Sequence, residues 1–164
     1  MSKTNGDPAK DKVWSPRVGL NYLIISSMSV YGLFDQSFVP ISGTDWQGNA
    51  FRPIRGNSLE AGVKKEWGAG KWISTLSIYQ IKRKNALVED SEHPNPNGGY
   101  YSKQLGETTT KGIEFDVTGE IVKGLSVNAN YALTDSKISK DTKETTIGNI
   151  TPNTAKHTAN AWVI

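Results

Sequence analysis

Two acidic residues, Glu114 and Asp116, are the side chains of this chain whose types and spacing best fit chemistry. Alternate residues of a β-strand project from the same face, so a strand would present both carboxyl groups together, as general acid and base catalysis requires. Thr118 and Glu120 continue the same polar row. Such a continuous row of polar side chains is explained by contact with a water-filled space and does not require catalysis. We therefore expect no enzymatic activity.

The other chemistry-bearing residues are isolated. His93 and His157 have no companion ligands at the spacing of a metal site, and the chain contains no cysteine. The sequence GAGK at 68–71 is not followed by the Ser or Thr of a phosphate-binding loop. We predict no metal site and no cofactor.

Charge also argues against a nucleic-acid partner. The 19 Lys and Arg residues nearly balance the 16 Asp and Glu residues, and the only dense basic cluster is Lys82, Arg83 and Lys84. A nucleic-acid-binding domain concentrates its positive charge on one face. We interpret this cluster as a solvated strand end.

The acidic row belongs to a longer two-faced pattern. Between 113 and 121 every second residue is apolar or glycine, and the pattern returns between 125 and 133 after a turn at Lys123 and Gly124. Strict alternation predicts half-buried strands, here two adjacent long ones joined by a tight turn.

Similar strands recur along the chain. We predict them at 17–24, 28–38, 58–67, 71–81, 113–121 and 125–133, with a last one beginning near His157. The connections at 26–27, 68–70 and 123–124 are short, whereas 39–57, 85–107 and 136–153 are long, polar and rich in turn residues.

This alternation of short and long connections distinguishes two architectures. Strands of a soluble sandwich are usually about 5 or 6 residues long. An outer-membrane barrel needs strands of about 9 to 11 residues, with tight turns at one rim and long loops at the other. The sequence predicts an all-β fold, an antiparallel up-and-down meander of long strands from a transmembrane β-barrel.

Each face of such strands has a predicted environment. Lipid offers no hydrogen bonds, so the apolar side chains would face the bilayer and the polar ones a lumen. Trp67 and Trp72 flank a turn, where an aromatic girdle is expected. The predicted lumen-facing residues are Glu114, Asp116, Glu120, Asn128 and Asn130.

Several segments together resemble a known family. They include SPRVGLNYLI, SVYGLFDQSFVPISGTD, FRPIRGNSLEAGVKKEW, STLSIYQIKRKNAL, TTTKGIEFDVTGEIVKGLSVNANYALTDSKI and TPNTAKHTANAWVI. Their order and spacing are similar to the barrel of TonB-dependent siderophore receptors, with the ferrichrome and hydroxamate type nearest. The resemblance covers 13–164.

The resemblance implies a bacterial outer-membrane receptor that binds a ferric siderophore and imports it with energy relayed by TonB. Barrels of this kind have about 22 strands and a plugged lumen. Iron would be present only as cargo, and the partners would be the siderophore, the TonB complex and outer-membrane lipid. We expect 1–12 to be a flexible segment and 13–164 a partial barrel. No signal peptide, plug, TonB-contacting box or terminal barrel strand is recognisable, so a fragment of a receptor is expected.

Ligand recognition, by the same resemblance, belongs in the long loops. Siderophore receptors of this kind present aromatic faces and cationic side chains to a compact polar complex. The candidates are Trp46, Phe51, Arg52, Arg55, Tyr100 and Tyr101, each of which could instead serve loop packing.

A second hypothesis comes from another class of protein. A soluble all-β ligand-binding module, with carbohydrate as a candidate ligand, also gives strands with one apolar and one polar face. The two hypotheses differ in what the apolar face contacts, which is lipid in a barrel and a protein core in a soluble module.

Overall fold

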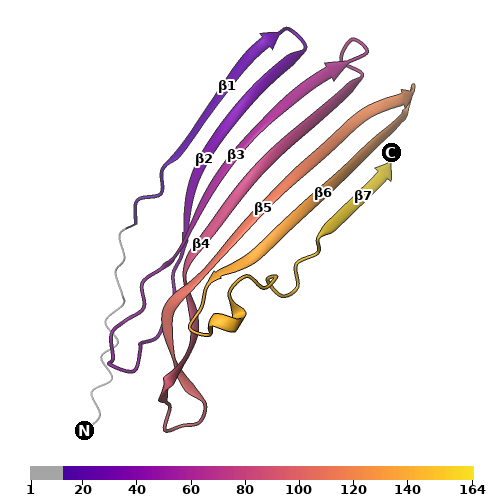
Figure 1. Ribbon diagram of the computed structural model, residues 1–164. Helices are drawn as coiled ribbons and strands as arrows, with labels where there is room; N and C mark the ends of the chain where they lie inside the picture. Colours follow the sequence, from indigo (N-terminus) through magenta and orange to yellow (C-terminus); the bar gives the residue numbers. More distant parts are fainter. Residues whose placement is uncertain (1–12) are drawn as a thin grey trace.

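The computed structural model describes residues 13–164, and the segment 1–12 that the sequence predicts to be flexible lies outside them. One seven-stranded sheet contains all the strands, each antiparallel to its neighbour in the sequence (Figure 1). This arrangement confirms the predicted antiparallel meander. The elements are β1 (Arg17–Ile25), β2 (Met28–Val39), β3 (Ile54–Trp67), β4 (Trp72–Pro94), β5 (Tyr100–Val122), β6 (Leu125–Lys140), the 3₁₀ helix η1 (Glu144–Thr146) and β7 (His157–Val163).

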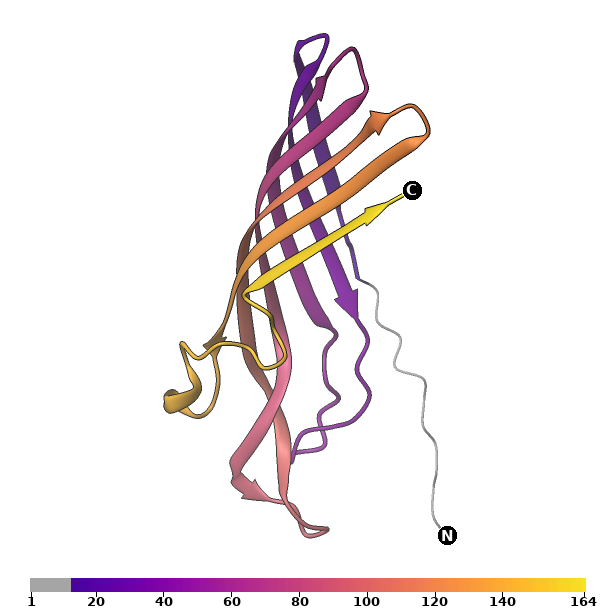
Figure 2. The same ribbon diagram turned by 90° about the vertical axis from the view of Figure 1, so that its right-hand side faces the viewer.

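The sheet is curved, and no second layer formed by residues 13–164 packs against either face (Figure 2). Among the described residues, Ile54 is the only buried hydrophobic side chain, with 7% of its surface exposed. Within 13–164, no helix is both long enough and apolar enough to span a bilayer. A sheet with a core of its own would bury one face, and residues 13–164 bury neither face of this sheet.

The strand register separates the side chains into two faces. Residues that lie directly opposite each other on neighbouring strands project from the same side of the sheet. One such row crosses β1 to β6 and contains Leu20, Gly32, Ala61, Ile78, Ile113 and Leu133. We call this side the nonpolar face. The next row, which includes Asn21, Tyr31, Ser77 and Glu114, lies on the opposite side, which we call the polar face. All five residues predicted to face a lumen lie on the polar face: Glu114, Asp116, Glu120, Asn128 and Asn130.

Large aromatic rings on both faces lie over glycines of neighbouring strands. A Cβ atom at Gly112 would meet the Tyr79 ring at 2.4 Å, and one at Gly119 would meet Trp72 at 2.2 Å. The Tyr79 hydroxyl thereby crosses β5 and reaches the Thr134 hydroxyl of β6, 3.1 Å away. Glycine is needed at these positions because a ring occupies the space that a side chain would take.

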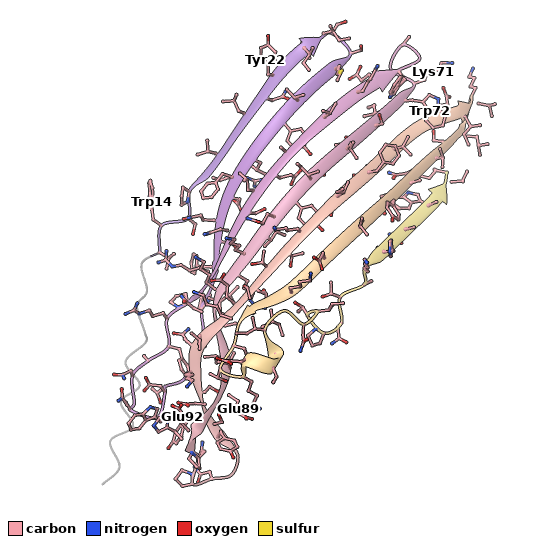
Figure 3. All side chains as sticks on the ribbon, in the orientation of Figure 1. Trp14, Tyr22, Lys71, Trp72, Glu89 and Glu92 are labelled. Atoms are coloured by element: carbon pink, nitrogen blue, oxygen red, sulfur yellow. The ribbon has the colours of Figure 1, made fainter. Side chains whose placement is uncertain are left out.

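The two tryptophans predicted to form a girdle pair directly with each other on the nonpolar face. Trp67 lies opposite Trp72 beside the 68–71 turn, and its indole N–H donates to Ser74 Oγ at 2.9 Å. The Lys65 ammonium lies 3.9 Å from the Trp67 ring centroid. Figure 3 shows Trp72 at the end of the sheet where the short turns lie. Aromatic rings with polar handles beside a cation are typical of a membrane interface.

Two strands are much longer than predicted. The sequence suggested a loop over 85–107, but β4 continues to Pro94 and β5 begins at Tyr100, which leaves only 95–99 as the connection. Polar composition was the reason for this error. Ladder hydrogen bonds require only backbone groups, so a hairpin with polar residues on both faces is stable in water when other segments pack on it. β3 and β6 likewise extend into the predicted loops, from Ile54 and to Lys140.

Candidate functional site

The connection 40–53, the outer half of the β4–β5 hairpin and the connection 141–156 meet at one end of the sheet (Figures 1 and 2). We call this region the loop end. The 23 residues of β4 span roughly 75 Å at ~3.4 Å per residue, against an apolar barrel band about 25 Å tall. A large part of this hairpin therefore extends beyond a band of that height.

The connection 40–53 contains a small hairpin organised by Asp45. Thr44 bridges to Ala50, and the amide of Phe51 donates to the carbonyl of Gly43 at 3.1 Å. The Asp45 carboxylate accepts from the amides of Gln47 and Asn49, both at 2.9 Å. An Asp that bonds backbone amides two and four residues ahead fixes a tight turn, so this tip has a defined conformation.

Trp46 projects from this tip and stacks on His93 of β4. The ring centroids lie 4.0 Å apart and the planes are 10° from parallel. His93 Nδ1 also lies 2.8 Å from Asp90 Oδ2, and this bond orients the imidazole. The stack brings together two residues that are distant in sequence and docks the tip of the 40–53 connection on the β4–β5 hairpin.

Asp90 is the centre of an ion-pair group. It is 2% exposed, and the Lys103 ammonium of β5 lies 3.1 Å from its Oδ1, outside hydrogen-bonding geometry. The same ammonium lies 3.8 Å from Glu92 Oε2. Burial tends to raise the pKa of the Asp90 carboxyl, but the His93 hydrogen bond and the Lys103 charge outweigh it and hold this pKa below its ordinary value.

Gln104 fastens the other end of the 40–53 connection to the hairpin. Its amide oxygen accepts from the backbone amide of Arg52 at 2.7 Å, and its amide nitrogen donates to the carbonyls of Arg52 and Asn85. The amide nitrogen of Asn85 in turn donates to the Pro53 carbonyl at 3.4 Å. The Arg52 guanidinium is left exposed, because only its backbone takes part.

The 141–156 connection attaches to β4 as well. The Thr142 hydroxyl donates to the Glu89 carbonyl at 3.1 Å, and the Lys143 ammonium lies 3.1 Å from Glu89 Oε1. Glu89 and Glu92, both labelled in Figure 3, lie on the part of the hairpin that projects past the sheet. The β4–β5 hairpin thus carries contacts to both other connections and organises the loop end.

The structure places only some of the predicted ligand residues together. Trp46, Phe51 and Arg52 all belong to the 40–53 connection, where the Phe51 ring lies over Gly43. Arg55, Tyr100 and Tyr101 were expected in loops, and this expectation is wrong because they lie in β3 and β5. Arg55 faces the nonpolar side opposite Lys84, whereas Tyr101 lies opposite Asp90 near the stack.

Sequence reasoning missed most of the loop-end contacts. His93 is not isolated, since Asp90, Glu92 and His93 each bring a potential metal-ligating atom within 4.8 Å of the others. The short run DSEH at 90–93 was the signal for this cluster. Because Lys103 pairs with both carboxylates, the group is organised as an ion-pair network. Lys103 and Gln104 carried no local signal, because their roles depend on partners from other segments.

The loop end should lose stability in acid only below the pH at which an ordinary aspartate is protonated. The Asn49 side chain and backbone hydrogen bonds hold the pKa of Asp45 below its usual value, and that of Asp90 is also lowered. A carboxyl with a lowered folded-state pKa contributes stability above its unfolded pKa, about 3.9, and loses it as the pH falls through the folded value.

We therefore expect the stacked tip to persist from neutral pH to about 4 and to loosen only below it. Hydrogen exchange of the Gln47 and Asn49 amides, measured across this range in the intact protein, checks the prediction. Asp45→Asn should raise exchange at these two amides above about pH 4, and its difference from wild type should shrink as the pH falls below this value. Loosening near neutral pH would show that neither aspartate controls the tip.

The architecture defines a class of protein: a section of an outer-membrane receptor barrel, with two-faced strands, tight turns at one end and structured connections at the other. The sequence model of the family described as "TonB dependent receptor-like, beta-barrel" matches residues 2–164. The chain belongs to this family.

Curated relatives are named as receptors and transporters. The chain is 32% identical over 127 residues to the metal-pseudopaline receptor CntO of Pseudomonas aeruginosa, covering 77% of the chain and 17% of the relative. It is 30% identical over 156 residues to the ferrichrome outer membrane transporter/phage receptor of Escherichia coli, covering 95% and 20%. The ferrioxamine B receptor of Salmonella typhimurium is 28% identical over 144 residues, with 88% and 20% covered. The chain spans about a fifth of the length of these relatives.

Solved structures agree on the fold. The pyoverdine outer membrane receptor FpvA of Pseudomonas aeruginosa, bound to pyoverdine, superposes with a TM-score of 0.75 at 24% identity, over 91% of this chain and 22% of that one. The alcaligin outer membrane receptor FauA of Bordetella pertussis gives a TM-score of 0.72 at 19% identity, over 91% and 25%. The seven strands thus match a section of larger receptor barrels.

Proposed function

We propose that this chain forms part of the barrel of an outer-membrane receptor that captures a ferric siderophore of the hydroxamate type. In this proposal the intact barrel has about 22 strands and a plugged lumen. The nonpolar face of this section contacts lipid, its polar face lines the lumen, and the loop end is at the cell surface. Import would draw on TonB through parts of the receptor outside this chain.

The observation that carries the proposal is the exposed nonpolar face. Leu20, Tyr22 and Ile78 are 75%, 64% and 59% exposed, and each belongs to a row of apolar residues that crosses several strands. A continuous apolar surface of this kind marks contact with lipid or another protein layer. The names of the relatives, which include receptors for ferrichrome and ferrioxamine B, support siderophore as the cargo.

The soluble-module hypothesis fits the structure less well. A soluble sandwich would cover its apolar face with a second sheet of the same domain, and residues 13–164 supply no such layer. Cell fractionation compares the two hypotheses directly. The intact protein should require detergent for extraction and migrate differently on electrophoresis before and after heating. A monodisperse monomer in buffer without detergent would contradict the receptor proposal.

Trp46 and Arg52 are the proposed ligand contacts of this chain. The indole is 46% exposed although it stacks on His93, and within 13–164 the Arg52 guanidinium has no carboxylate within 4.0 Å. An aromatic face and a free cation suit the surface of an anionic or oxygen-rich iron complex. Asp90, Lys103 and Gln104 would act by positioning the segment that carries them.

Ferric siderophore binding to cells that express the intact receptor tests these contacts. We expect Trp46→Ala to weaken binding of ferric ferrichrome or ferrioxamine B by about 30-fold, which corresponds to ~2 kcal/mol for an aromatic contact. Trp67→Ala at the opposite end of the sheet is the matched control and should leave the affinity unchanged. If Trp46→Ala and wild type bind with equal affinity and both receptors are correctly assembled, Trp46 does not contact the ligand.

A further inference from the structure

The ladder between β4 and β5 is interrupted where the hairpin projects past the sheet. Asp90 and Pro94 pair with consecutive residues of β5, so residues 91–93 form a bulge on β4. In a regular strand, residues three positions apart project from opposite faces. The bulge instead brings His93 back to Asp90, and the imidazole Nδ1 lies 2.8 Å from Asp90 Oδ2. Bulges that re-aim a side chain in this way are frequent beside functional sites.

The Asp90 carboxylate is buried at this bulge with one oxygen unsatisfied. The residue is 2% exposed, and its Oδ1 accepts no hydrogen bond from residues 13–164. A buried carboxylate oxygen without a hydrogen bond is costly, because burial removes the water that would solvate its charge. Glu92 and His93 each bring a further ligand atom, and the three atoms lie within 4.8 Å of one another. This arrangement favours a cation that bonds to Oδ1 directly.

The Lys103 ammonium marks where such a cation would lie. It is 3.1 Å from Asp90 Oδ1 and 3.8 Å from Glu92 Oε2, so it lies between the two carboxylates, outside hydrogen-bonding geometry to Oδ1. The side chains of Lys103 and Glu92 are 32% and 78% exposed, and both have room to move. An ion pair with such exposure is weak, so moving the ammonium into water costs little. A divalent ion brings twice the charge.

We propose that Asp90, Glu92 and His93 bind a divalent transition metal ion of the Zn²⁺ class, which replaces the Lys103 ammonium. Two carboxylates and an imidazole supply three ligands of a tetrahedral zinc site, and water supplies the fourth. Ca²⁺ and Mg²⁺ fit less well, because they prefer six or more oxygen ligands. The ion-pair network is then the metal-free form of the site.

Metal binding at this site would act on the loop end through the imidazole. His93 stacks on Trp46 with ring centroids 4.0 Å apart, so an ion that fixes the imidazole also holds the tip of the 40–53 connection on the hairpin. This inference needs the structure of the loop end and does not depend on the proposed siderophore cargo or membrane orientation. Failure of either of those proposals leaves it standing.

Zn²⁺ binding to the intact receptor, purified in detergent without siderophore and followed by calorimetry, tests the site. Loss of even an outer partner of a metal ligand weakens binding about 10-fold or more, so we expect at least this loss in His93→Ala and in Glu92→Gln. Glu92→Gln serves if His93→Ala disturbs the loop end, because the Glu92 side chain is exposed. Lys103→Gln should strengthen binding about fivefold, since it removes the competing ammonium.

Two matched controls come from the same chain. His157→Ala removes the other histidine, which bonds to the Tyr131 hydroxyl at 2.8 Å on β6. Lys143→Gln removes another ammonium of the loop end, one that pairs with Glu89. Both variants should keep the Zn²⁺ affinity of wild type.

Four results would overturn the metal site. They are unchanged affinity in His93→Ala and Glu92→Gln, an equal loss in His157→Ala, weaker binding in Lys103→Gln, and Ca²⁺ binding as tight as that of Zn²⁺. A gain in Lys103→Gln together with losses in the two ligand variants supports it, because a purely structural ion-pair network would not bind Zn²⁺ more tightly when its cation is removed.

Discussion

Replacing Leu76 with arginine is expected to cost about 2 to 4 kcal/mol of folding free energy, because the cation would lie in the central part of the hydrocarbon band. Leu76 is 51% exposed on the nonpolar face and shares a row with Val63 and Phe115. The row toward the loop end contains Ala61, Ile78 and Ile113, and the row toward the tryptophan pair contains Lys65, Ser74 and Val117. The assembled receptor should fall in amount, and its unfolding midpoint in denaturant should shift down.

The neighbouring residue gives a matched control. Thr75 is adjacent on β4 and lies on the polar face opposite Asp116, so Thr75→Arg adds the same charge on the other side of the same strand. We expect that variant to assemble nearly as wild type. Equal damage from both substitutions would mean that the two faces do not differ in environment, and the proposed contact with lipid would be wrong.

Depth adds a second check on the same prediction. The register places Ile113 one row from Lys111 and Leu76 one row from Lys65, so the two residues lie at similar distances from the charged ends of the apolar band. The cost of an arginine falls to about 0 to 1 kcal/mol near the interfaces. Ile113→Arg should therefore cost about as much as Leu76→Arg, and a much smaller cost at one of the two residues would place that residue near an interface.

Replacing Gly119 with valine is expected to destabilise the barrel by about 1 to 3 kcal/mol through overpacking. A Cβ atom there would lie 2.2 Å from ring atoms of Trp72, so either the indole or the strand must move. Equilibrium unfolding of the intact receptor in detergent measures the change. In a Trp72→Ala background the same substitution should cost much less, because the ring that it meets is gone.

Gly32→Val is the control for that cycle. Gly32 also lies within a strand on the nonpolar face, but a Cβ atom there meets only the Glu60 carbonyl oxygen, at 4.0 Å. We expect little loss of stability. If Gly32→Val and Gly119→Val were equally harmful, glycine would be required for a general reason of backbone conformation, and the contact with Trp72 would be incidental.

The alternation of apolar and polar residues along each strand determined most of the fold. The alternation over 113–121 and 125–133 assigns each side chain to a face, because consecutive residues of a strand point to opposite sides whatever their partners are. The turns at 68–71 and 123–124 follow from their glycines, which adopt positive φ angles. The sequence therefore predicted the antiparallel meander, the polar row of Glu114 and Asp116, and the position of Trp67 and Trp72 beside a turn at one end.

The loop end depended on tertiary structure. Nothing near Trp46 in the sequence indicates that it stacks on His93, and nothing near Asp90 indicates that Lys103 neutralises it. Polar composition made 85–107 look like a loop, although cross-strand partners keep most of it in β4 and β5. Alternation is a property of each strand alone, whereas register and docking are set by residues far away in the chain. For the same reason the sequence alone does not indicate that Arg55 lies directly opposite Lys84.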